Sequence, residues 1–209
     1  NVHGGVSLDR AFRDCIASPF TVRAITYRTQ QEIAHRDVSL SVCVQKMIRS
    51  DRACSCVMFT IDTETGFPDV VVINSAFGLG ELVVQGRVNP DEFIVHKPTL
   101  EAGFRPIVRR KLGEKALRMV YTDAGGAAVM EERVSEGDRR VFSLTDDEVL
   151  ELARTALTVE RHYSKAAGKP RPMDIEWAKD GLTGELHVLQ ARPETVHGQQ
   201  ERPVLDLFH

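Results

Sequence analysis

The sequence predicts an α+β fold in which strands and helices are mixed. Short β-branched and apolar runs bounded by turn residues predict strands, and one long segment with apolar residues at helical spacing predicts a helix. These segments do not alternate regularly, which argues against a doubly wound parallel sheet. The chain has 209 residues, of which 42% are hydrophobic. That is enough to bury a core, as one domain or as two lobes of about 100 residues each.

Helices are predicted from caps and spacing. Ser7 can cap a helix whose apolar residues recur every three or four positions, and Ser18-Pro19 ends it. The clearest helix spans 146–163, where Thr145 is the N-cap and Glu148 completes a capping box. Its core-facing stripe consists of Val149, Leu152, Ala153, Ala156 and Leu157. A short helix is also expected over 82–85.

Strands are predicted where apolar or β-branched residues alternate or run together. The expected strands are 21–27, 42–48, 56–61, 70–74, 92–96, 127–134, 173–178 and 185–192. A loop with Gly66 and Pro68 joins 56–61 to 70–74, which predicts a hairpin. The stretch 98–140 is mixed in pattern, and Gly125-Gly126 marks a turn in it.

Composition excludes several classes of partner. The 27 Lys and Arg residues against 30 Asp and Glu give a net charge of −3, without the basic excess of a protein that binds bulk nucleic acid or an anionic membrane. The longest apolar runs, such as 70–73, have four residues, whereas a membrane span needs about 20. We expect a soluble, cytoplasmic protein. The chain opens without Met, so we also expect a piece of a longer protein.

The four cysteines predict free thiols rather than a metal knuckle. Cys54 and Cys56 are separated by one residue, but no second pair or nearby His completes four ligands at zinc-finger spacing. Cys15 and Cys43 also border apolar stretches. All four are therefore expected to be buried and reduced.

The last predicted hairpin carries the most informative polar residues. Asp174 and Glu176 share one face of its first strand, and Gln190 and Arg192 share one face of the second. If paired residue numbers have an even sum, all four side chains line one surface. Carboxylate and amide oxygens suit Mg²⁺, and a guanidinium suits a phosphoryl group. The pattern predicts a site for Mg²⁺ and a nucleoside triphosphate, or else a solvated edge hairpin with a cross-strand Glu–Arg pair.

Two further segments are candidates for ligand contacts. The stretch 77–81 contains Gly78 and Gly80, which permit close approach of a ligand to the backbone but equally fit a tight turn. It is neither a Walker A loop nor a full GxGxxG motif. The stretch 44–48 can present backbone groups and an apolar slot to a base, or form an ordinary core strand.

Taken in order, these motifs resemble the nucleotide-binding region of the phosphoenolpyruvate synthase (pyruvate, water dikinase) family, which is related to pyruvate phosphate dikinase. The resemblance covers roughly residues 12–197. The matching stretches are 44–51, 57–60, 77–81, 85–86, 88–93, 142–146, 173–178 and 189–193.

The resemblance implies an ATP-grasp fold, with mostly antiparallel mixed sheets and flanking helices, in which ATP lies between two lobes. It implies that 1–41 belong to the first lobe, that 42–196 form the second, nucleotide-binding lobe, and that 197–209 are a linker toward a phosphohistidine domain. The reaction implied converts ATP, pyruvate and water to AMP, phosphoenolpyruvate and phosphate. ATP and Mg²⁺ are thus the implied substrate and cofactor, and a homodimer of the full-length enzyme is left open.

The resemblance also assigns residues. It implies Mg²⁺ ligation by Glu176 and Gln190, with Asp174 beside them, and catalytic contact of Arg192 with the transferred phosphates. It places Glu81 near the ribose. The remaining nucleotide contacts it implies are Gln45, Lys46, Met47, Ile48, Gly78 and Gly80.

Several departures from the family pattern are evident. Cys43 and Cys56 stand where the family usually has Gly, and Val22 stands where it often has Asp. A Cys does not favour a positive φ, so these positions are either ordinary strand or an altered adenine slot. No stretch before Arg10 matches the family segment that supplies a Lys and an Arg to the phosphates, so we expect no turnover from this chain alone. A related dikinase, an antibiotic phosphotransferase and a non-catalytic interaction module on the same fold stay open as alternatives.

Overall fold

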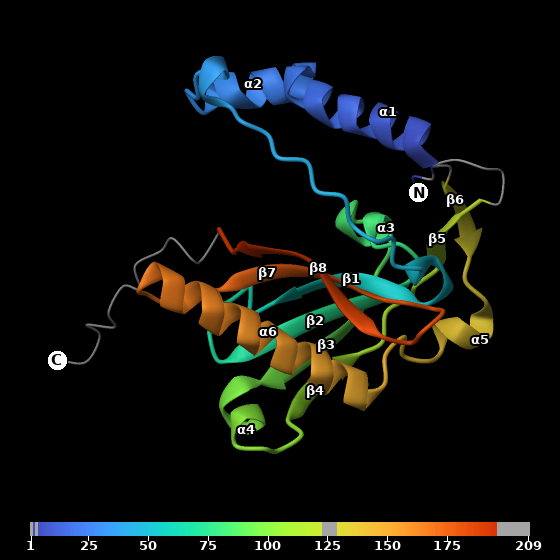
Figure 1. Ribbon diagram of the computed structural model, residues 1–209. Helices are drawn as coiled ribbons and strands as arrows, with labels where there is room; N and C mark the ends of the chain where they lie inside the picture. Colours follow the sequence, from blue (N-terminus) through green and yellow to red (C-terminus); the bar gives the residue numbers. More distant parts are fainter. Residues whose placement is uncertain (1, 3, 123–128, 196–209) are drawn as a thin grey trace. The chain divides into compact units, whose positions relative to one another are not determined.

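A computed structural model describes residues 2, 4–122 and 129–195 (Figure 1). The chain divides into two compact units, residues 1–47 with 121–129 and residues 48–120 with 130–209. Strands and helices are mixed, and the main sheet is antiparallel, which confirms the α+β class.

The first unit begins with helices. They are α1 (Gly4–Ala17), the 3-10 turn η1 (Ser18–Phe20), α2 (Val22–Gln30) and the 3-10 turn η2 (His35–Asp37). α1 confirms the predicted N-terminal helix, although it starts before Ser7 and carries no buried residue. It ends directly before Ser18-Pro19, as expected.

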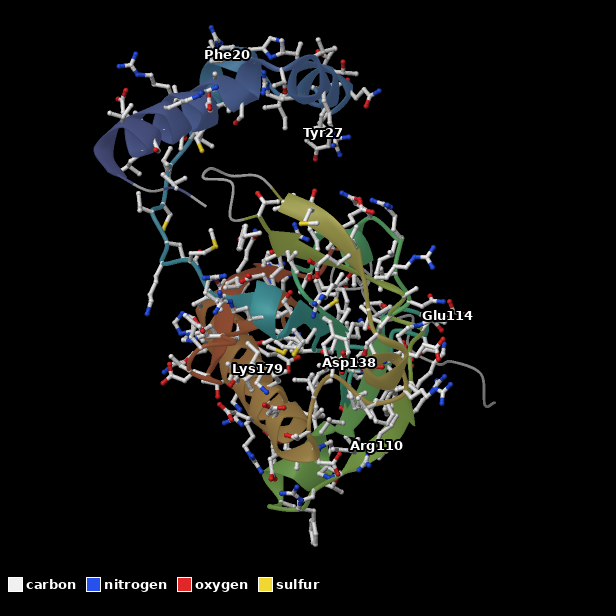
Figure 2. The ribbon with its side chains drawn as sticks, turned by 90° about the vertical axis from the view of Figure 1, so that its right-hand side faces the viewer. Phe20, Tyr27, Arg110, Glu114, Asp138 and Lys179 are labelled. Carbon is white, nitrogen blue, oxygen red and sulfur yellow. The ribbon has the colours of Figure 1, made fainter. Side chains whose placement is uncertain are left out.

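The predicted strand over 21–27 is wrong, because these residues begin α2. Thr21 is the N-cap, and its hydroxyl accepts a hydrogen bond from the Ala24 amide. Arg28 is buried in the last turn and donates to the Pro19 carbonyl at 2.5 Å and to His35 at 3.1 Å. This cap and tether outweigh the weak strand preference of the alternating residues. Phe20 and Tyr27 remain largely exposed (Figure 2).

The predicted strand over 42–48 is also wrong. The segment has no regular secondary structure, and no strand in the described part of the chain pairs with it. Val44 is 73% exposed, so the apolar residues here are not in a core. Cys43 and Cys15 are exposed too, and the expectation of buried thiols holds only for Cys54 and Cys56.

The second unit is built on a six-stranded sheet with the order β4-β3-β2-β1-β7-β8. Its neighbouring strands are antiparallel. Their bounds are β1 (Cys54–Phe59), β2 (Val70–Phe77), β3 (Asp91–His96), β4 (Ile107–Lys111), β7 (Met173–Lys179) and β8 (Leu186–Pro193). The two predicted hairpins and the strand over 92–96 are confirmed. Cys56 lies in regular strand without a positive φ.

α6 (Asp146–Ala167) crosses one face of this sheet (Figure 1). Thr145 and Glu148 form the predicted capping box, and Gly168 with φ 66° ends the helix. The predicted stripe is buried in one cluster with strand residues such as Met58, Ile73 and Trp177. Lys179 of β7, which is labelled in Figure 2, also forms an ion pair with Glu148 of α6.

Smaller elements complete this unit. They are η3 (Ser50–Arg52), α3 (Glu81–Val84), α4 (Lys97–Glu101), α5 (Glu136–Arg139), and the two-stranded pair β5 (Leu117–Tyr121) and β6 (Val129–Arg133). In this pair, Tyr121 and Val129 are counted with the first unit. α3 confirms the short helix over 82–85, and β6 lies within the predicted 127–134. The predicted turn at Gly125-Gly126 lies outside the described residues. Among the described residues, every helix is too short or too polar to span a bilayer.

A buried ion pair ties the loop before β5 to the sheet. Lys115 Nζ lies 2.5 Å from Asp91 Oδ1, and both side chains are fully buried. Asp91 also accepts hydrogen bonds from the Gly113 amide and from the amide and hydroxyl of Ser143. The Asp91 carboxylate therefore joins β3, the loop over 112–116 and the segment that leads into α6.

Candidate functional site

The hairpin β7–β8 brings together the four polar residues that the sequence singled out. Asp174 lies opposite Arg192, and Glu176 lies opposite Gln190. The paired numbers have an even sum, so the four side chains share one face of the sheet. The register shifts directly after Glu176, where a β-bulge interrupts the pairing.

This face points away from the core. Met173, Ile175 and Trp177 are fully buried in the cluster that includes α6. Asp174 and Glu176 alternate with them and are half-buried, and Gln190 and Arg192 are exposed. The polar face therefore has a rigid support on one side and an accessible surface on the other.

Asp174 fixes the Arg192 side chain. Arg192 Nε donates to Asp174 Oδ2 at 2.8 Å, and this hydrogen bond, with the charge of the carboxylate, raises the pKa of Arg192. The terminal guanidinium nitrogens take no part in this bond and suit an oxyanion. Asp174 Oδ1 is buried without a hydrogen-bond partner in the described ranges. The pair thus combines an oriented cation with an unsatisfied buried oxygen.

A pocket of about 520 Å³ opens beside this pair. Its lining includes Phe59 at the end of β1, Thr63 in the loop between β1 and β2, and the segment 193–195. Phe59 is the register partner of Asp174. Sequence reasoning missed Phe59 and Thr63, because their place beside the last hairpin depends on the pairing of β1 with β7, which no local pattern reveals.

The donor set suits a hard divalent cation in part. Glu176 and Gln190 offer a carboxylate and an amide oxygen on adjoining strands, and Asp174 Oδ1 is unsatisfied. No group of three or more His, Cys, Asp or Glu side chains in the described ranges forms a metal cluster. A cation here would take the rest of its oxygen ligands from water and phosphate, as Mg²⁺ commonly does.

The glycine loop is held tightly against β1 and β5. Gly78 has φ 82°, and a Cβ there would lie 2.5 Å from the Met119 carbonyl oxygen. The Gly78 amide donates to the Ala53 carbonyl at 3.1 Å, and its own carbonyl accepts from the Ser55 hydroxyl at 2.8 Å. Gly78 therefore meets the needs of a tight turn and close packing.

Gly80 lies over the start of β1. A Cβ on Gly80 would lie 3.5 Å from the Ser55 hydroxyl oxygen and 3.6 Å from Cys56 Cα. The next residue, Glu81, begins α3, is exposed, and accepts a hydrogen bond from the Gln85 side chain at 3.0 Å. The face above Ser55 is therefore where this loop meets the sheet.

The candidate base-binding segment falls in two parts of the chain. Gln45, Lys46 and Met47 belong to the first unit, and Ile48 belongs to the second. Within the first unit, the three residues line an apolar pocket of about 1150 Å³ together with α1. The Tyr121 hydroxyl lies 2.9 Å from Met47 Sδ and helps to hold that side chain.

Known proteins resemble this chain over its full length. Residues 1–206 match the family described as "Pyruvate phosphate dikinase, AMP/ATP-binding domain". The chain is 51% identical over 208 residues to phosphoenolpyruvate synthase of Aquifex aeolicus and 55% identical over 201 residues to that of Escherichia coli. It is 39% identical over 204 residues to a probable phosphoenolpyruvate synthase of Methanocaldococcus jannaschii.

These alignments cover nearly all of this chain but only a small share of each relative. They include 100%, 95% and 97% of this chain, but only 24%, 25% and 16% of the respective relatives. The chain therefore spans about a quarter, or less, of the length of the curated relatives it matches.

Proposed function

Because the chain belongs to the family of pyruvate phosphate dikinase AMP/ATP-binding domains, we propose that it is the nucleotide-binding part of a phosphotransferase of the phosphoenolpyruvate synthase type. The whole reaction converts ATP, pyruvate and water to AMP, phosphoenolpyruvate and phosphate through a phosphohistidine carrier outside this chain. The observation that carries the proposal is the set of four polar side chains in register on one open face of β7–β8.

The order of contacts along β1 supports this function. Gly80 approaches Ser55, Glu176 lies opposite Val57, and Asp174 lies opposite Phe59. The path from Ser55 to Phe59 covers about 13 Å at the rise of a β-strand. A nucleotide laid along it has its ribose near Glu81 and its phosphates toward Arg192.

Arg192 binds and orients the phosphates in this proposal. Its Nε is occupied by Asp174, so the remaining guanidinium nitrogens are presented to the ligand in a fixed plane. Because the Asp174 contact raises the pKa of Arg192, the guanidinium stays charged. Catalysis by this chain is then positioning and charge neutralisation, without a covalent intermediate of its own.

Glu176 and Gln190 hold Mg²⁺ in this proposal, with Asp174 as an added ligand. When bound, the cation neutralises charge on the phosphate oxygens. The two side chains orient the metal–nucleotide complex because their strands are hydrogen-bonded neighbours. The register shifts directly after Glu176, so the pairing that aligns Glu176 with Gln190 and Asp174 with Arg192 belongs to the part of the hairpin before the bulge.

The same proposal extends to the fold and the base. We assign an ATP-grasp arrangement, with 1–41 from the first lobe, 42–196 as the second lobe and 197–209 as a linker. Gln45, Lys46, Met47 and Ile48 form the adenine slot, and Gly78 and Gly80 keep the backbone close to the nucleotide. The apolar pocket beside Gln45–Met47 supports a base-binding role for this segment.

The test is a hybrid enzyme in which this chain replaces the matching segment of the Escherichia coli relative. We expect it to form AMP and phosphate from ATP only when pyruvate is present. Arg192→Ala should lower kcat at least about 100-fold, the size typical for loss of a charge-stabilising contact. Arg154→Ala, an exposed change on α6, is the matched control.

The outcomes separate the function from the site. A hybrid that makes no pyruvate-dependent AMP, beside an active parent enzyme, contradicts the proposed function. A hybrid that turns over equally well with Arg192→Ala contradicts only the assignment of Arg192.

A further inference from the structure

We propose that the Thr63 hydroxyl is a further phosphate contact, which donates a hydrogen bond to the terminal phosphate of the bound nucleotide. This inference rests on the proposed function. Thr63 lines the pocket of about 520 Å³ beside Asp174 and Arg192, whereas Glu176 and Gln190 are not among its lining residues. The pocket therefore extends the polar face beyond the candidate metal ligands, at the end where a phosphate chain would terminate.

Few side chains that line the pocket can donate a hydrogen bond to a phosphate. Phe59 and Pro193 offer no polar side-chain hydrogen, and Glu194 is only 6% exposed and accepts rather than donates when ionised. Asp174 is paired with Arg192 and, like Glu194, has no hydrogen to donate when ionised. Donors to a phosphate must therefore come from the guanidinium and from threonine hydroxyl groups.

The loop that carries Thr63 is pinned on both sides of it. Asp62 accepts hydrogen bonds from the Glu64 amide at 3.0 Å and from the Thr65 hydroxyl at 2.6 Å. The Gly66 amide also donates a hydrogen bond to the Asp62 carbonyl at 2.8 Å, and the Asp62 amide donates to the Phe67 carbonyl at 2.9 Å. Thr63 therefore lies within a closed turn whose backbone is held on both sides of it, as a residue that makes a specific contact requires.

The root of this loop is bonded directly to the strand that carries Asp174. The Met173 amide donates to the Thr60 hydroxyl at 2.8 Å, and the Thr60 amide donates to the Met173 carbonyl at 3.0 Å. Lys97, paired with Glu160, also donates to the Thr60 carbonyl at 2.6 Å. These bonds fix the position of Thr63 relative to the Asp174–Arg192 pair. Thr195 also lines the pocket.

The test compares nucleotides that differ in their terminal phosphates. In the hybrid enzyme, calorimetric titration measures the Kd of ATP and of AMP for Thr63→Val, which replaces the hydroxyl by a methyl group of similar size. Loss of a hydrogen bond to a charged group should weaken ATP binding about 10- to 100-fold. AMP, which lacks the terminal phosphate, should bind unchanged, and Thr63→Ser should restore ATP binding.

Matched variants guard against indirect effects. Thr63→Ala removes the same hydroxyl without added bulk, and it should reproduce the loss seen with valine. Thr158→Val removes an exposed hydroxyl that bonds within α6, and it should leave both Kd values unchanged.

Three results would overturn the inference. If Thr63→Val and Thr63→Ala both bind ATP with a Kd within twofold of the unsubstituted protein, Thr63 is not a phosphate contact, but the proposed function stands. An equal loss of ATP and AMP affinity shows a structural role instead of a phosphate contact. Failure of the unsubstituted hybrid to bind either nucleotide contradicts the proposed function itself.

Discussion

Replacing Lys115 by Met should destabilise the second unit by about 3 kcal/mol, at the lower end of the range for breaking a buried ion pair. The Asp91 carboxylate would stay buried but lose the ammonium group 2.5 Å from its Oδ1. The Gly113 carbonyl would lose its donor at 3.1 Å. Asp91 would keep hydrogen bonds from Gly113 and Ser143, which limit the loss.

Urea unfolding with linear extrapolation measures this effect on the free energy of unfolding. The control is Arg161→Met, which breaks an exposed ion pair with Glu101 and should cost about 1 kcal/mol or less. Domains are commonly stable by only about 5–15 kcal/mol, so the Lys115 effect is easily resolved. A cost for Lys115→Met no larger than that of Arg161→Met would refute the reasoning.

Three further results are expected. A thiol reagent should modify Cys15 and Cys43 in the native protein and all four cysteines after unfolding, because burial raises the pKa of the Cys54 and Cys56 thiols to about 12. Rapid reaction of all four thiols in the native protein would contradict this. Gly78→Ala should cost more than about 1 kcal/mol in urea unfolding, since its Cβ would meet the Met119 carbonyl; no change would refute the packing argument. Burial alone would raise the pKa of Glu148, but hydrogen bonds from Lys179 and Thr145 lower it. That stabilisation is present above the unfolded pKa and is lost as pH falls through the folded pKa. Glu148→Gln should therefore cost stability at neutral pH and progressively less below about pH 4, and a cost independent of pH would contradict this.

The parts of the fold that the sequence predicts well are those set by local rules. α6 follows from a cap at Thr145, an acid at Glu148 and an apolar stripe, all within one segment. Strand alternation places Asp174 and Glu176 on one face of β7. To place Gln190 and Arg192 of β8 on that same face, one only has to know whether paired residue numbers have an even or an odd sum.

The errors arise where local patterns are ambiguous. Residues 21–27 alternate like a strand, but a cap at Thr21 and the Arg28 tether favour a helix. The sequence around Val44 is typical of a strand, but no strand in the described ranges pairs with it, so it forms no part of a sheet there. β4 was not predicted, because it is exposed along nearly its whole length and therefore lacks the alternating apolar residues of a half-buried strand.

The candidate site shows the same limit. Asp174, Glu176, Gln190 and Arg192 could be grouped from sequence because they lie in one hairpin. Phe59 and Thr63 could not, because the ladder between β1 and β7 joins residues more than 110 positions apart. Long-range strand pairing is decided by the assembled sheet, and sequence periodicity carries no signal of which strands become neighbours.

The most direct test of the central claim is the Kd of ATP measured by calorimetry with and without Mg²⁺, in the hybrid enzyme and in its Glu176→Gln variant. The account predicts that Mg²⁺ strengthens ATP binding to the unsubstituted protein and that Glu176→Gln weakens the Mg²⁺-dependent part at least about tenfold. Glu151→Gln, an exposed change on α6, should bind like the unsubstituted protein. Equal ATP affinity of the Glu176→Gln variant and the unsubstituted protein in the presence of Mg²⁺ would contradict the claim that the open face of β7–β8 holds the metal and the nucleotide.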